Sequence, residues 1–218
     1  MDIFTAIQND DLEQARALVA SDPNVGKQRD ADGVSALLTA LYFGRSAIAD
    51  ELVGAAPDLD VFEAAAYGRI ERLEELVGAD PTLANAWSPD GFQPLGLAVF
   101  FGHPEAARFL IDQGADVDQA ARHAHIKAAP IHSATAASDP AARVELTRLL
   151  LDRGANVNAA QEGGFTPLHA AAQHGDAELA RLLLDRGADR TATTDDGRAA
   201  GAIAREQGQA ELAELLGG

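Results

Sequence analysis

The chain has no cysteine, few aromatic residues and no long apolar run. The lack of cysteine and the lack of a long apolar run each exclude a class of protein. Without cysteine it cannot form a disulfide bond, a thiolate metal site or a cysteine nucleophile. No apolar stretch approaches the roughly 18 residues of a membrane-spanning helix. The start, MDIFTAIQND, also lacks the basic segment and apolar run of a secretory signal. The sequence therefore predicts a cytoplasmic protein that does not span a membrane.

Basic residues are the second scarcity, since 17 Lys and Arg stand against 34 Asp and Glu, for a net charge of −17. This charge excludes nucleic acid and anionic lipid as general partners, because like charges repel. Only 2 of the basic residues are Lys, whereas Ala occurs 47 times, a bias that indicates a GC-rich bacterial genome. Hydrophobic residues make up 47% of the chain, too many for disorder, but only 11 residues are aromatic. An alanine-rich core requires closely packed helices.

A repeated motif organises the chain. Its fullest copy, GFTPLHAAAQHG at 164–175, is followed by LLLDRGAD at 182–189, and LLLDRGAN and FLIDQGAD recur at 149–156 and 109–116. Motif prolines at 94, 130 and 167 lie 36 and 37 residues apart, whereas Ala199 follows Thr166 by 33. The longer spacings indicate insertions of three residues near 118–128 and four near 139–142.

Local chemistry predicts two helices in each unit. Thr166 and Pro167 suit the cap and the first position of a helix, which Gly175 ends in a turn. A second amphipathic helix follows and stops before Gly187. One such pair cannot bury its apolar face alone, so neighbouring pairs must stack.

These residues, TPLH at 166–169 with Ala171, Ala172, Gly175 and the following LL and GA pairs, closely resemble the ankyrin repeat. The resemblance is strong over 88–116 and 144–216 and weaker over 30–60. It implies an all-α fold, an α-solenoid of stacked helix-turn-helix repeats with short β-hairpin loops, in a single domain of about six to seven repeats over 1–218. The expected units are 1–29 (N-terminal cap), 30–60, 61–87 (shortened), 88–117, 118–158 (with insertions), 159–191 and 192–218 (C-terminal cap).

An internal duplication underlies the shortened unit. Residues 2–44 align without gaps to 60–102, and the Asp-Pro pair at 22–23 recurs at 80–81. Gly44 and Gly68 are only 24 residues apart, which indicates that unit 61–87 has lost about nine residues of the preceding hairpin.

The resemblance also implies a concave binding surface made from hairpin tips and first helices. The two residues before each turn glycine face this groove, and five of the 11 aromatic residues occupy such positions. Exposed aromatic residues mark contact sites. Alternatively, Phe43 and Phe101, which are equivalent in the duplication, fill gaps between repeats. The predicted protein-binding residues are Tyr42, Phe43, Tyr67, Trp87, Phe92, Phe100, Phe101, Arg122, His123 and His125.

The histidines divide into two groups. His132 and His169 occupy the His position of the TPLH motif, where the resemblance implies hydrogen bonds between repeats, and His103 is expected to be structural too. His123 and His125 lie in the locally basic insertion RHAHIK at 122–127, which either contacts a partner or forms a disordered loop. A metal site with His132 or His103 is a further alternative, although spacing of this kind is common by chance.

No catalytic motif is present: there is no GxSxG, phosphate loop or HExxH, so no catalytic residue, cofactor or metal is predicted. The expected function is noncatalytic protein binding, to a partner with basic and apolar surface. One alternative is an enzyme or small-molecule binder that uses the groove as an apolar pocket on which His103, His125 or Glu63 converge. Another is a homodimer that buries the aromatic patch.

Overall fold

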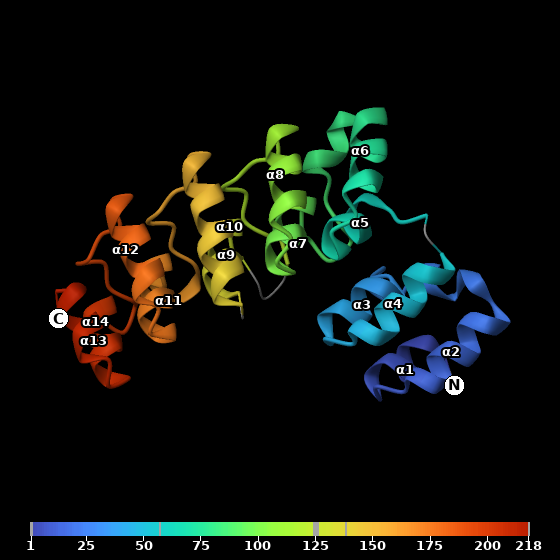
Figure 1. Cartoon of the computed structure of the whole chain (residues 1–218), viewed down its shortest axis with the longest axis horizontal. Coiled ribbons are helices and arrows are strands. Elements are labelled where there is room, and N and C mark those ends of the chain that lie inside the picture. The colour runs from blue at the N-terminus through green and yellow to red at the C-terminus, as the bar shows by residue number, and fades with distance from the viewer. Residues whose placement is uncertain (1, 57, 124–126, 138, 218) are drawn as a thin grey trace.

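The computed structural model describes residues 2–56, 58–123, 127–137 and 139–217, which form a curved stack of helix pairs (Figure 1). The first helices of the pairs are α1 (Ile3–Gln8), α3 (Ala36–Tyr42), α5 (Val61–Tyr67), α7 (Pro94–Phe100), α9 (Pro130–Ala136), α11 (Pro167–His174) and α13 (Ala200–Glu206). The second helices are α2 (Leu12–Ser21), α4 (Ser46–Ala55), α6 (Ile70–Ala79), α8 (Pro104–Asp112), α10 (Pro140–Asp152), α12 (Ala177–Asp185) and α14 (Ala210–Leu215). Short 3-10 turns, η1 (Pro23–Lys27), η2 (Pro81–Asn85) and η3 (Glu162–Gly164), lie in the connections.

The loops carry little β structure. Within the described residues the bridges are isolated ones, between Arg29 and Ser35 and between Thr193 and Ala199, at the bases of two hairpins. The predicted all-α solenoid with short hairpin loops is therefore confirmed. None of the helices in the described ranges combines the length and the apolar character needed to cross a membrane.

The unit with the fullest motif folds as its local sequence predicts. Thr166 caps α11 from an extended conformation, Pro167 takes the first helical position, and Gly175 ends the helix with a φ of 69°. Asp176 then caps α12, because its carboxylate accepts a hydrogen bond from the Leu179 backbone N–H at 2.9 Å. The two helices are thus fixed by the residues between them.

The core combines alanines with leucines and other large aliphatic residues, on first and second helices alike. Ala64, Ala65 and Ala66 of α5 have no exposed surface, and neither do Leu73 of α6 and Leu110 of α8. Small side chains let α5 pack closely on α7, and the row continues through α9 and α11 to α13. The buried alanines are in this way what makes the close helix packing possible.

The stack changes direction between α4 and α5 (Figure 1). At this bend α3 makes only a small contact with α5, whereas α5 packs extensively on α7. Because α4 ends at Ala55 and α5 begins at Val61, little chain lies between them, and the hairpin that precedes α3 reaches the hairpin that precedes α7. Gly33 lies so near Pro89 that a Cβ on Gly33 would be 3.0 Å from the Pro89 Cβ. The shortened unit therefore brings the concave sides of α3 and α7 together.

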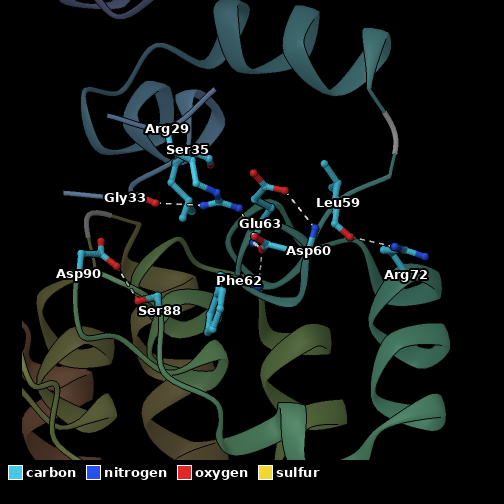
Figure 2. A network of polar contacts seen from close by, with 11 residues as sticks. Arg29, Gly33, Ser35, Leu59, Asp60, Phe62, Glu63, Arg72, Ser88 and Asp90 are labelled. Atoms are coloured by element: carbon cyan, nitrogen blue, oxygen red, sulfur yellow. Dashed lines mark hydrogen bonds and ion pairs between the residues drawn. The ribbon is translucent and has the colours of Figure 1, made fainter. Parts of the chain in front are cut away.

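A polar network stabilises the bend (Figure 2). Arg29 donates to the Asp60 carboxylate at 2.8 Å and to the Gly33 carbonyl at 3.1 Å. Asp60 caps α5 by accepting from the backbone N–H groups of Phe62 and Glu63, each at 2.9 Å. The Glu63 carboxylate accepts from the Asp60 N–H at 3.0 Å, which completes a capping box. Burial, with the nearby charge of Asp60, raises the pKa of Glu63.

The second insertion lengthens a helix. Residues 139–142 form the cap and first turn of α10, which has 13 residues where α8 and α12 have nine. This turn places Arg143 next to Asp176, with their charged atoms 2.9 Å apart and side chains only 7% and 11% exposed. Arg143 also donates two hydrogen bonds to the Ala137 carbonyl, at 2.9 and 2.7 Å. This buried ion pair joins two neighbouring units.

Candidate binding surface

Motif histidines bridge successive units. His169 Nδ1 accepts a hydrogen bond from the Thr166 N–H at 3.0 Å, so the ring proton belongs on Nε2. That Nε2 lies 3.1 Å from the Arg198 carbonyl of the next unit, and His132 makes the same link to Ala159 at 2.9 Å. Burial lowers the pKa of both histidines, which favours this neutral form. The prediction that they hydrogen-bond between repeats is confirmed.

Two residues of the enzyme alternative, His103 and Glu63, have structural partners away from the groove. His103 Nε2 lies 3.0 Å from the Ala66 carbonyl and connects α8 to α5, as its expected structural role requires. Glu63 belongs to the capping box at the bend. Neither side chain lines the large cavity described below, so their expected convergence there is wrong. His125 lies outside the described residues, which contain no group of three or more metal-ligating side chains placed for an ion.

Four predicted site residues meet at the bend and form an aromatic cluster: Tyr42, Phe92, Phe100 and Phe101. Tyr42 reaches across from α3, and its ring centroid lies 5.6 Å from that of Phe101, 6.3 Å from Phe92 and 6.4 Å from Phe100. Phe100 and Phe101, at the end of α7, meet edge to face at 5.0 Å. Such tilted and edge contacts are favourable for aromatic rings.

The aromatic side chains differ in exposure. Phe100 is 54% exposed and Phe43 is 49% exposed, and they are the exposed large hydrophobic residues of the described chain. Tyr42, Phe92 and Phe101 are half-buried and pack against the core. The gap-filling alternative therefore fits Phe101 but does not fit its duplicate Phe43.

Tyr67 lies apart from the aromatic cluster. Its hydroxyl donates to Asp50 of α4, and its ring lies 5.0 Å from the guanidinium carbon of Arg69. Sequence reasoning placed Tyr67 on the concave surface by its motif position alone. The bend changes what surrounds that position, because α4 and α5 follow different directions.

Arg122 and His123, in the described part of the first insertion, pack on the hairpin that precedes α7. The Arg122 guanidinium lies over the Trp87 ring at 3.9 Å, and the His123 ring stacks on Phe92 at 5.4 Å. The Arg122 N–H donates to the Gly91 carbonyl at 2.7 Å. Gly91 has a φ of 85°, and a Cβ there would lie 2.7 Å from the His123 nitrogen. Glycine is therefore required for this contact. Four of the predicted site residues meet here.

An apolar cavity of about 610 Å³ lies between α7, α9 and the insertion. Its lining residues are Tyr42, Asp90, Phe92, Gln93, Gly96, Leu97, Phe100, Gln119, Ala121, His123, Ala128, Pro130, His132, Ser133, Ala136 and Ala137. The motif places Ala136 and Ala137, at the end of α9, on the groove, but Pro130 and Ser133, which also line the cavity, were not predicted from the sequence. One signal was available, because QPLG at 93–96 matches TPLH and puts Gly96 where the motif has histidine.

An acidic hollow of about 730 Å³ adjoins the cavity and shares Tyr42, Asp90 and His123 with it. The other lining residues are Asp30, Asp32, Val34, Thr39, Phe43, Trp87, Ser88, Pro89, Gly91 and Arg122. Asp90 accepts hydrogen bonds from the Tyr42 hydroxyl at 2.8 Å and the Ser88 hydroxyl at 2.5 Å. Its carboxylate thus stands at the boundary of the two depressions.

Comparison with known proteins agrees with this architecture. A family model described as ankyrin repeats (3 copies) matches residues 61–161, and one described as ankyrin repeats (many copies) matches residues 150–204. The mouse protein called ankyrin repeat and SOCS box protein 16 is 43% identical over 77 residues, which are 35% of this chain. The chain covers only 15% of that relative's length. The stacked helix pairs form a helical repeat solenoid. In particular, the chain is built of ankyrin repeats.

Proposed function

We propose that the chain is a noncatalytic module that binds a partner protein on its concave side, around Phe43 and Phe100. Ankyrin repeats are generally protein–protein interaction modules, and proteins built of them are typically not enzymes. The observation that carries the proposal is the 54% exposure of Phe100 beside a large apolar cavity. Exposed apolar surface around a depression is costly in water unless a partner covers it.

The partner's chemistry follows from charge. The net charge of −17 favours a partner with basic as well as apolar surface, and disfavours nucleic acid and anionic membranes. The arginine and alanine bias favours a GC-rich bacterial genome as the source. The similarity to the mouse protein is confined to a small part of that protein, so its name adds nothing about the partner.

The test uses the full chain as bait in a native lysate, with Phe100→Ala and Phe43→Ala as test variants. Phe109→Ala serves as the control, since this half-buried ring lies on the second helix α8. Captured proteins are cross-linked and the cross-linked residues mapped by mass spectrometry. We expect cross-links near α7 and the 87–92 hairpin. We also expect Phe100→Ala, alone or combined with Phe43→Ala, to reduce partner capture at least fivefold.

Full capture by both test variants would contradict the proposal. The mass of the wild-type protein in solution is measured in parallel by light scattering. A dimer that becomes a monomer on Phe100→Ala would instead identify self-association as the role of this surface.

A further inference from the structure

We infer that the apolar cavity and the acidic hollow are two adjacent subsites for one extended partner segment, which places a large apolar side chain in the cavity and a basic side chain against the carboxylates. This inference rests on the proposed function and specifies the partner chemistry that the site selects.

The cavity exists because a repeat position is empty. Gly96 takes the place of the motif histidine in α7, and a Cβ on Gly96 would meet no atom within 4 Å. Phe92, Phe100 and Pro130 form apolar walls around this space. Its volume of about 610 Å³ falls within the range of about 300–1,000 Å³ typical of ligand sites. The cavity can therefore accept a large apolar group with adjoining main chain.

The hollow presents three carboxylates that form no ion pair with the described residues of the chain. Asp30, Asp32 and Asp90 line it, and none of the ion pairs formed among the described residues involves these three carboxylates. The one guanidinium at the hollow, that of Arg122, lies over the Trp87 ring. A basic side chain would meet complementary charge here.

Adjacency links the two subsites. Tyr42, Asp90 and His123 line both depressions, so a ligand leaving one enters the other directly. Successive residues of an extended segment advance about 3.3 Å, and a few residues therefore suffice to reach both. Charge argues against a second copy of this chain as occupant, because both copies would carry −17. A small apolar molecule would fill the cavity without using the carboxylates.

The probes are three fluorescein-labelled peptides of equal length in a glycine–serine frame. The first carries tryptophan with two arginines, the second tryptophan with two glutamates, and the third alanine with two arginines. Affinities for the full chain are measured by anisotropy, and the contacted residues by amide chemical shifts. We expect the first peptide to bind at least tenfold more tightly than either other peptide and to shift residues of α7, α9 and 119–123.

Variants assign the two subsites. Gly96→Leu fills the cavity, and Gly78→Leu is its matched control, an exposed helical glycine on α6 with equally open surroundings. Gly96→Ala is the milder variant should the leucine disturb folding. Asp32→Asn removes a carboxylate of the hollow, and Asp185→Asn does the same at an exposed position of α12. Gly96→Leu should weaken binding of the first peptide at least tenfold. Asp32→Asn should halve the ratio of the affinities for the first and second peptides. Both control variants should bind within twofold of wild type.

Three outcomes would overturn the inference. The first and third peptides could bind equally, which would mean that charge alone attracts them. Gly96→Leu and Gly96→Ala could both leave binding unchanged. Native mass spectrometry could also reveal a small molecule that is bound to wild type and absent from Gly96→Leu. Partner capture that depends on Phe100 but not on Gly96 would refute this inference and leave the proposed function intact.

Discussion

Tyr42 donates its hydroxyl hydrogen to Asp90 over 2.8 Å, although 48 residues separate them along the chain. The bond joins α3 directly to the hairpin that precedes α7 and does not involve α5. Together with the ring contacts of Tyr42 it attaches the first two helix pairs to the others, in addition to the Arg29–Asp60 and Tyr67–Asp50 contacts at the bend.

Tyr42→Phe should destabilise the protein by about 1–2 kcal/mol at pH 7, since a hydrogen bond to a charged acceptor is lost while the ring packing stays. Urea unfolding measures the difference. Tyr67→Phe removes a more exposed hydroxyl that donates to Asp50, and should cost less. If Tyr67→Phe lowered the free energy of unfolding more than Tyr42→Phe, the prediction that the Tyr42–Asp90 bond stabilises the bend would be wrong.

Tyr42→Phe should also change how the free energy of unfolding depends on pH above about pH 9. Burial and the charge of Asp90 raise the pKa of Tyr42 above its ordinary value of 10.0. The unfolded chain therefore loses this proton first, and the stability that Tyr42 contributes below about pH 10 declines as pH rises further. We expect the wild-type advantage over Tyr42→Phe to narrow between pH 9 and 11. An advantage that widens would contradict the sign of the shift.

Arg143→Ala should cost about 3–5 kcal/mol, because it leaves the buried carboxylate of Asp176 without its cation. The matched control is Arg153→Ala, whose partner pair with Asp112 is 32% and 53% exposed. That variant should cost no more than about 1 kcal/mol. Urea denaturation at pH 7 compares the two, and equal losses would show that the buried pair contributes no more than a surface pair.

Acid should weaken the histidine links between units. Burial lowers the folded pKa of His132 and His169 below the ordinary 6.5. The unfolded chain takes up protons first, so the stability contributed above pH 6.5 is lost as pH falls through the folded pKa values. His169→Gln should show a smaller decline between pH 7 and pH 5 than wild type. NMR titration of the imidazoles checks the cause, and a raised pKa at either residue would refute it.

Glu63 should respond in the opposite direction. Burial and Asp60 raise its pKa above the ordinary 4.5, so the stability that it contributes in acid is lost as pH rises toward neutral. Glu63→Gln keeps an oxygen for the capping box without the charge. We expect the unfolding temperature of Glu63→Gln to rise relative to that of wild type as the pH increases from 4 to 7. Glu74→Gln, an exposed position on α6, should track wild type at every pH.

Much of the fold could be predicted from the sequence, because the repeat signal is local. Thr166, Pro167 and Gly175 specify one helix and its ends through their own backbone preferences. The links from His132 and His169 follow from the same motif, since each ring reaches only into the next unit. Interactions between adjacent repeats are therefore accessible to sequence reasoning.

The surface could be predicted only in part, because the bend changes which units meet. The shortened unit 61–87 was visible as a spacing of 24 residues, but spacing does not give the direction in which a stack turns. Tyr42 and Tyr67 were therefore assigned to one patch, whereas the structure sends Tyr42 to Asp90 and Tyr67 to Asp50. The cavity likewise depends on α9, whose motif position places its alanines on the groove but does not predict a hollow beside them.

The contact between α3 and the 88–91 hairpin also affects how the protein comes apart. In a linear repeat array each unit touches only its neighbours, so an end can fray one unit at a time. Here Tyr42 couples two units that are not neighbours, and loss of the first helix pairs would release Phe92, Phe100 and Asp90 as well. Order at the N-terminal end and order at the proposed binding surface are in this way coupled.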